Sequence, residues 1–181
     1  MSAPSMYEQV LGEAFDRLPA AVQRFHRLRG DWTLAGQAQT QAPASVPARL
    51  LAWALGTPRS ATSGTIRFEL SAEPRVETWT RHFPAQTMRS TLRLAGAELH
   101  EVLGASRLRF QLLASPTGLE MRLIGLHFMG IPCPRWLMPE VVAREHGDGR
   151  RIEFHVAARV RGIGQVASYR GHLDLPEESA R

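Results

Sequence analysis

The sequence predicts an α+β protein that is mostly antiparallel β, a barrel-like or strongly curved meander of about ten strands. Apolar and polar residues alternate with a period of two through residues 64–127, which is typical of strands with one buried face. The breaks between the runs are short and contain glycine or proline, as hairpin turns do. The runs also recur about every ten residues, a spacing that favours a curved or closed sheet.

Three runs show the alternation most clearly. Their apolar positions are Ile66, Phe68 and Leu70, then Leu108, Phe110 and Leu112, then Leu119, Met121 and Leu123. The residues between them are mainly charged or polar, so each run predicts a strand that buries one side and exposes the other to water.

Short helices are expected before the first strand, within residues 1–30. Ser5 and Glu8 have the spacing of a capping box, which predicts a helix start. Pro19 suits the first turn of a second helix, and Gly30 ends it. We expect both helices to pack on the sheet.

The first strand is expected over residues 32–41, and its inward side includes Trp32 and the small residues Gly36 and Ala38. These small residues indicate that another segment packs closely across the strand. A helix near residues 47–56 follows, because Pro47 can open it and Gly56 can end it. A strand, a helix and then a long meander is reminiscent of lipocalin-like and helix-grip folds.

The last third of the chain begins with a segment that cannot be a central strand, because prolines interrupt residues 128–139. Strands are expected again over residues 140–146, then around residues 154–160, and then up to residue 175. Residues 176–181 form a polar tail. We therefore predict a single domain over 1–181, with its β-barrel-like sheet in 31–175.

Composition limits the functional classes. The 181 residues carry a net charge of +5, and all 22 basic residues other than histidine are arginines. The arginines are spread along the polar faces of strands and form no run, so we expect a solvated surface and no nucleic-acid partner.

The sequence predicts neither metal nor cofactor. It contains no His-Glu-x-x-His, paired-cysteine, phosphate-loop or dinucleotide motif, and the single Cys133 cannot form an intramolecular disulfide. The first residues lack the pattern of a signal peptide, and no apolar run is long enough to cross a bilayer. These features predict a cytoplasmic protein.

Polar side chains on apolar strand faces are the candidate functional residues. The predicted ligand-binding residues are Arg81, Tyr169, Trp79, Glu101 and Glu145. A buried charge is costly unless it is paired, so Arg81 should meet Glu101, Glu145 or Glu77. One interpretation is a buried ion pair that fixes the register of the barrel. The other is a pocket in which Arg81 and Tyr169 hold the carboxylate or phosphate of a ligand while Trp79 stacks on its body.

The segment 128–139 is apolar and aromatic around Arg135. It can fold over one mouth of the barrel and seal the core, or act as a lid over a ligand through Phe128, Met129 and Trp136. Aromatic residues beside an arginine also suit the boundary between water and lipid, so peripheral membrane contact through this segment is a third interpretation.

Several motifs taken together resemble the bacterial DUF4166 family, a domain of unknown function. They are Tyr7 to Gly12 with Phe15, Leu18 and Pro19; Trp79 to Phe83; Arg89, Ser90 and Leu92; Gly130 to Pro132 with Pro134, Leu137 and Pro139; Glu145; and Tyr169 to Leu173. The resemblance covers nearly the whole chain and implies no established activity. Relatives resemble domains joined to redox or NAD-binding modules, and no such module is present in this sequence.

We therefore predict that the protein binds a small apolar or amphipathic, lipid-like ligand inside the barrel without catalysis. One alternative is an enzyme that uses Glu101 and Glu145 as a carboxylate pair in that cavity. Another is a structural or partner-binding domain with a filled core.

Overall fold

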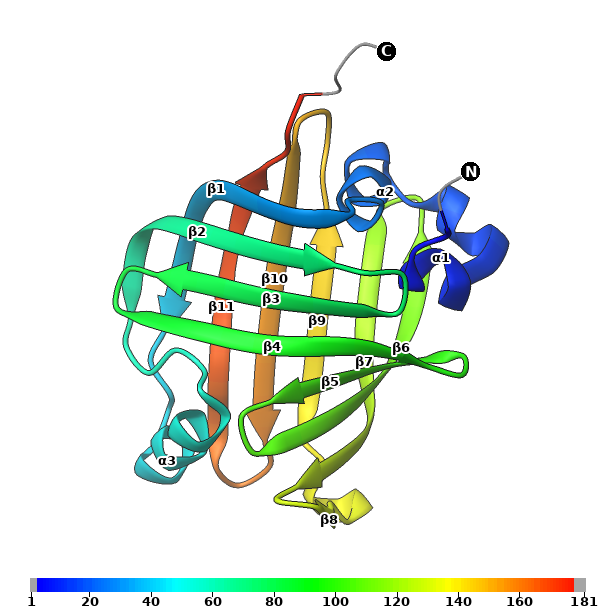
Figure 1. The fold of residues 1–181 in the computed structure, drawn as a ribbon. Coiled ribbons are helices and arrows are strands. Elements are labelled where there is room, and N and C mark those ends of the chain that lie inside the picture. Colours follow the sequence, from blue (N-terminus) through cyan, green and yellow to red (C-terminus); the bar gives the residue numbers. More distant parts are fainter. Residues whose placement is uncertain (1–2, 178–181) are drawn as a thin grey trace.

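The computed structural model describes residues 3–177, and their strands form a closed antiparallel barrel (Figure 1). Ten strands pair in the order β6-β5-β4-β3-β2-β1-β11-β10-β9-β7, and β7 pairs with β6 to complete the circle. The short strand β8 pairs only with β7. Apart from this hairpin, each strand lies beside the strands that precede and follow it, which is the connectivity that short turns predict. The α+β, mostly antiparallel fold class is confirmed.

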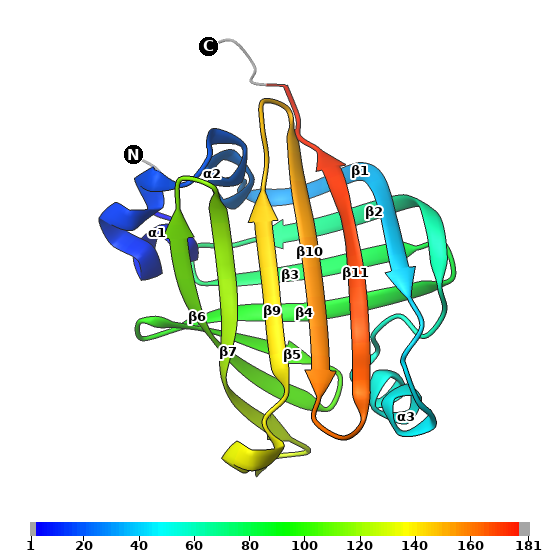
Figure 2. The same cartoon turned by 180° about the vertical axis from the view of Figure 1, so that it is seen from behind.

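The strands have the following bounds: β1 Gly30–Gln41, β2 Thr62–Ala72, β3 Val76–Phe83, β4 Gln86–Ala95, β5 Glu98–Leu103, β6 Ser106–Ser115, β7 Gly118–Phe128, β8 Ile131–Pro132, β9 Glu140–His146, β10 Arg151–Val160 and β11 Gly164–Asp174. Strands β2 to β4 cross in front of β9 to β11 at a steep angle, so the barrel resembles two curved sheets joined at their corners (Figure 1). Figure 2 shows the same crossing from behind.

Helices cover one end of the barrel and flank the other. The helices α1 (Met6–Leu11), η1 (Gly12–Arg17) and α2 (Ala20–His26) lie at one end, which we call the plug end. At the opposite end, α3 (Val46–Leu55) packs against β11, and the short helix η2 (Arg135–Leu137) follows β8 (Figures 1 and 2). None of these helices within residues 3–177 has the length and apolar character needed to span a bilayer.

Most of the expected helix signals are found, but Gly30 does not end the second helix: α2 ends at His26, and Gly30 is the first residue of β1. Ser5 and Glu8 form a complete capping box at the start of α1. Ser45 caps α3 by accepting a hydrogen bond from the Ala48 amide, and Gly56 ends α3 in the left-handed conformation. The turn of 3-10 helix between α1 and α2 was not expected from the sequence.

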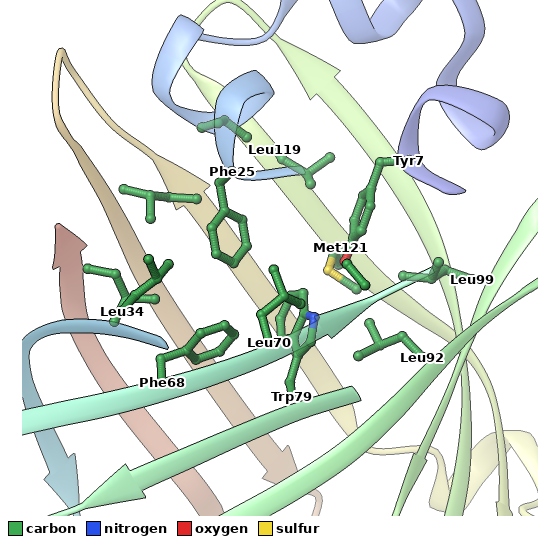
Figure 3. Close-up of a cluster of buried hydrophobic side chains, with 14 of the residues drawn as sticks. Tyr7, Phe25, Leu34, Phe68, Leu70, Trp79, Leu92, Leu99, Leu119 and Met121 are labelled. Carbon is green, nitrogen blue, oxygen red and sulfur yellow. The ribbon is translucent and has the colours of Figure 1, made fainter. Parts of the chain in front are cut away.

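The main core fills the barrel interior and continues into the plug. Figure 3 shows Tyr7 from α1 and Phe25 from α2 pointing in among strand residues such as Trp79 and Met121. Inward positions alternate with exposed ones along the strands, as the period of two predicts. Trp32 is an exception, because it lies at the outer end of β1 and is 36% exposed. Most of the predicted tail, residues 178–181, lies outside the described residues.

Two glycines make the pairing of β1 with β11 possible. A Cβ atom on Gly36 would lie 1.8 Å from the His172 carbonyl oxygen, and one on Gly171 would lie 2.1 Å from the Gln37 carbonyl oxygen. Both distances are far below van der Waals contact, so any side chain at either position would force the strands apart. The close packing predicted across the small residues of the first strand is confirmed.

We predict that Gly36→Ala destabilises the protein by about 3 kcal/mol or more, because the added methyl overlaps a backbone atom that cannot move independently. In a chain of this size that loss lowers the melting temperature by about 6–12 °C. Thermal unfolding followed by circular dichroism measures the change. Ala35→Ser, at the exposed neighbouring position, is the control and should change stability by no more than about 0.5 kcal/mol. An unchanged melting temperature for Gly36→Ala would contradict the close approach of β1 and β11, the seam at which the barrel closes.

Candidate functional site

A cavity of about 90 Å³ lies inside the barrel. Its wall is mostly apolar and comes from nearly every strand, with Phe25 of α2 as the helical contribution. The apolar lining residues include Ile66, Phe68, Met88, Leu92, Leu108, Phe110, Met121, Ile152, Phe154 and Leu173. A few polar groups in a mostly apolar wall are the usual composition of a ligand pocket.

The polar lining consists of residues that the sequence singled out. All five predicted ligand-binding residues border this one cavity, namely Trp79 and Arg81 on β3, Glu101 on β5, Glu145 on β9 and Tyr169 on β11. Each occupies an inward position of its strand and is no more than 9% exposed. The structure thus brings together residues that lie up to 90 positions apart in the sequence.

Arg81 does not form the ion pair that we expected. Among residues 3–177, no carboxylate oxygen lies within 4.0 Å of its guanidinium, although the side chain is buried. Its only side-chain hydrogen bond is donated by Nη1 to the hydroxyl oxygen of Ser90, at 3.2 Å. The expectation was wrong because each carboxylate has another partner: His26 for Glu145, the Trp79 indole for Glu77 and Ser90 for Glu101. The charge of Arg81 still acts on Glu101 and lowers its pKa.

Aromatic rings take the place of a counter-ion around Arg81. The guanidinium carbon lies 4.9 Å from the centre of the Trp79 ring and 5.9 Å from that of Phe68. Such cation–π contacts contribute about 0.5–2 kcal/mol each, which offsets only part of the cost of burying the charge. Arg81 is therefore a buried cation that can accept an anion from the cavity.

Glu145 is bound to the helical plug. Its Oε2 lies 2.6 Å from His26 Nε2, in a hydrogen bond buried between β9 and α2. The His26 ring stacks on Tyr7, with ring centres 3.6 Å apart. The Tyr7 hydroxyl and His26 Nδ1 are buried and have no hydrogen-bond partner within residues 3–177. Neither residue lines the cavity, so these two atoms are unsatisfied polar groups of the plug.

Glu77 has an unusual protonation equilibrium. Burial raises the pKa of Glu77 to about 7, although nearby His26 and the hydrogen bond donated by the Trp79 indole both oppose the rise. The carboxyl group is therefore close to half protonated at neutral pH.

Burial also raises the pKa values of other groups inside the barrel. It raises the pKa of Glu101, and the positive charge of Arg81 only partly opposes that rise. Burial likewise raises the pKa of Tyr169 and of Tyr7 above the usual tyrosine value, so both hydroxyls stay neutral and can donate hydrogen bonds. The positive charge of Arg81 therefore acts on both Glu101 and Tyr169 and lowers the pKa of each against the effect of burial.

The predicted lid residues lie away from the cavity. Met129 and Trp136 are 74% and 75% exposed, and neither they nor Phe128 line the cavity. They lie on the β7–β8 hairpin and η2, at the end opposite the plug. Their role as a lid stays a prediction.

The sequence did not predict that His26 and Tyr7 would lie next to Glu145, behind the cavity wall. His26 shares a helical face with Val22 and Phe25, and this spacing places it inward. The partner of His26, however, is 119 positions away, so the pairing has no sequence signal. Within residues 3–177, no group of three or more His, Cys, Asp or Glu side chains is arranged to hold a metal ion.

The chain matches a known protein family over most of its length. Residues 18–173 match the family described as "Domain of unknown function (DUF4166)". Among solved structures, the chain is similar to Rv2717c from M. tuberculosis, with 13% sequence identity and a TM-score of 0.47. The match covers 88% of this chain and 99% of that chain. No curated protein matches the chain.

The raised pKa of Glu77 predicts how stability depends on pH. In the unfolded chain Glu77 loses its proton near pH 4.5, whereas in the folded protein it keeps the proton until about pH 7. The folded state thus binds more protons in this window, so the contribution of Glu77 to stability falls as pH rises from 4.5 to 7.

We predict that Glu77→Gln removes this loss, so that the variant gains roughly 2–3 kcal/mol relative to wild type between pH 5 and pH 8. Urea unfolding at the two pH values measures the difference. Glu73→Gln, at an exposed position, is the control and should change stability equally at both pH values. A Glu77→Gln effect that is the same at pH 5 and pH 8 would rule out the raised pKa.

Proposed function

The chain belongs to the DUF4166 family, and we propose that it binds a small amphipathic molecule with an anionic head inside its barrel, without catalysis. The observation that carries the proposal is Arg81, a buried guanidinium that faces the cavity with no carboxylate within 4.0 Å among the described residues. A carboxylate or phosphate of the ligand would supply the missing charge through charge-assisted hydrogen bonds.

The groups around Arg81 support an anion over a cation. Burial raises the pKa of Glu101, and in its protonated form this carboxyl group would donate a hydrogen bond to the anion instead of repelling it. Tyr169, also neutral, lines the same cavity and can donate a second hydrogen bond. Trp79 and Phe68 present ring faces for the apolar body of the ligand.

The volume of the cavity limits the size of the ligand. A cavity of about 150 Å³ holds benzene in another protein, so the 90 Å³ here suits only a small group unless the wall moves. Met88 and Met121 belong to that wall, and unbranched methionine side chains repack easily. We therefore favour a short-chain ligand over a full-length lipid, the ligand class suggested by the likeness to lipocalin-like and helix-grip folds.

A carboxylate-pair enzyme is the second candidate, because Glu101 and Glu145 line the same cavity. Glu145, however, already shares a buried hydrogen bond with His26, which leaves one carboxyl group of the pair less free to act. Ligand binding at Arg81 does not require Glu145 to leave its hydrogen bond with His26. Turnover of a bound compound that depends on Glu101 would favour the enzyme.

A series of matched probes tests the binding function. We predict that hexanoate binds at least about tenfold more tightly than 1-hexanol, because only the carboxylate pairs with Arg81, and that hexylamine does not bind. Titration followed by the NMR signal of the Trp79 indole N–H, which donates to Glu77 at 2.8 Å, reports occupancy of the cavity. Lengthening the chain from butyrate to dodecanoate then measures how far the wall can move.

Arg81→Met should lower hexanoate affinity by about 10- to 100-fold and leave 1-hexanol binding nearly unchanged. Arg89→Met is the matched control, because Arg89 lies on the exposed face of the neighbouring strand β4. The order of the three probes in the wild-type protein tests the proposal even if Arg81→Met fails to fold. Equal affinity for the acid and the alcohol, or binding of none of the carboxylates from butyrate to dodecanoate, would exclude an anionic ligand.

A further inference from the structure

We propose that the end of the barrel opposite the plug docks on the surface of an anionic lipid membrane. The docking end consists of α3, the β10–β11 turn and the segment 129–137, which contains β8 and η2. This inference stands on surface residues and does not depend on what the cavity binds.

Exposed apolar side chains concentrate at the docking end. Seven of the ten large hydrophobic residues that are exposed within residues 3–177 lie there. They are Val46, Leu50 and Trp53 on α3, and Met129, Ile131, Trp136 and Leu137 on the hairpin and η2. Their exposed fractions reach 75%, although a soluble surface normally carries such residues singly.

The spacing on α3 gives that helix two apolar faces. Val46, Leu50 and Trp53 follow one another at four and three positions, so they share one side of the helix. That side faces away from the barrel, whereas Ala48 and Ala52 are fully buried and pack with Val166 of β11. Packing within this chain therefore does not account for the three apolar side chains on the outer face of α3.

The apolar elements belong to one connected surface. The Ala105 amide of the β5–β6 turn donates to the Ala54 carbonyl of α3 at 3.2 Å, and the Met129 amide donates to the Ala105 carbonyl at 2.8 Å. On the other side, the Ser45 hydroxyl donates to the Ile163 carbonyl of the β10–β11 turn at 2.8 Å. Figures 1 and 2 both show α3 and the β8 region at the same end, away from the plug.

The charged side chains of the docking end are positive. Arg49 on α3, Arg135 on η2 and Arg161 in the β10–β11 turn are exposed, and none has a carboxylate within 4.0 Å in the described part of the chain. No aspartate or glutamate occurs in residues 32–68, 102–119, 121–139 or 154–173. Glu140, the first residue of β9, is the first acidic residue that follows the segment 129–137 in the sequence.

This combination fits an anionic membrane better than another protein. Tryptophan at the boundary of lipid and water, next to arginines that contact phosphates, is the usual composition of a peripheral membrane surface. Acidic residues lie instead at the plug end, for example Glu8, Glu13 and Asp16. A second copy of the chain docking through the same face would bring two sets of unpaired arginines together, so charge repulsion disfavours self-association.

Vesicle flotation with the full-length chain tests the proposal. Vesicles of phosphatidylcholine alone are compared with vesicles that contain about one-third phosphatidylglycerol, enough to set up the negative surface potential. We expect binding to the anionic vesicles and little to the neutral ones, with binding that weakens as salt is added. Replacing Trp53 and Trp136 with serine should abolish binding, because both anchors are lost.

A matched pair of triple variants separates the docking end from the overall positive charge. Arg49→Gln, Arg135→Gln and Arg161→Gln together should weaken binding by about 100-fold, since each arginine near an anionic surface contributes about fivefold. Arg17→Gln, Arg75→Gln and Arg93→Gln remove the same charge near the plug end and should leave binding nearly unchanged. All six positions are exposed, so both triple variants should keep the wild-type melting temperature.

Three outcomes would overturn the proposal. The first is an absence of binding to anionic vesicles at low salt. The second is an equal loss of binding in both triple variants, which would mean that the charge acts without a defined surface. The third is a concentration-dependent dimer in sedimentation analysis that Trp53→Ser and Trp136→Ser dissociate, which would assign the face to a second copy.

Discussion

Closure between the first and last long strands is the constraint on which the remaining structure depends. β1 and β11 are the two ends of the meander, and their pairing turns a curved sheet into a barrel with an interior. Gly36 and Gly171 allow this pairing because neither position has room for a Cβ atom. Without closure, Arg81, Glu101, Glu145 and Tyr169 would lie on an open face, where water would solvate them. The unusual electrostatics of the interior therefore follow from the geometry of the seam.

Within the closed barrel, the distribution of partners decides what the polar groups can do. His26 reaches Glu145 from the plug, and the Trp79 indole hydrogen-bonds Glu77. Arg81 lies against two aromatic rings and one hydroxyl, and its charge also acts on Glu101, although no carboxylate oxygen lies within 4.0 Å of it among the described residues. A site built only for stability would pair this guanidinium with a carboxylate, because an unpaired buried charge is costly. The arrangement is consistent with a cavity whose counter-ion comes from outside the chain.

The two ends of the barrel differ in the side chains that they expose. The plug end carries the helices whose side chains complete the core and most of the acidic residues of the N-terminal segment. The opposite end carries exposed apolar residues, and its arginines have no carboxylate partner among residues 3–177. Under the proposed docking, this difference would set which end of the barrel meets the membrane.

The sequence by itself determined the fold class, the meander of neighbouring strands and most of the inward residues, with Trp32 as an exception, because alternation and turn chemistry are local properties. It also identified the five polar residues that line the cavity, since a charge on an apolar strand face is visible in the pattern. Only the tertiary structure decided which of these residues meet. The pairing of Glu145 with His26 spans 119 positions, and the isolation of Arg81 depends on side-chain distances across the barrel. Such contacts arise from the curvature and closure of the whole sheet, which no local pattern encodes.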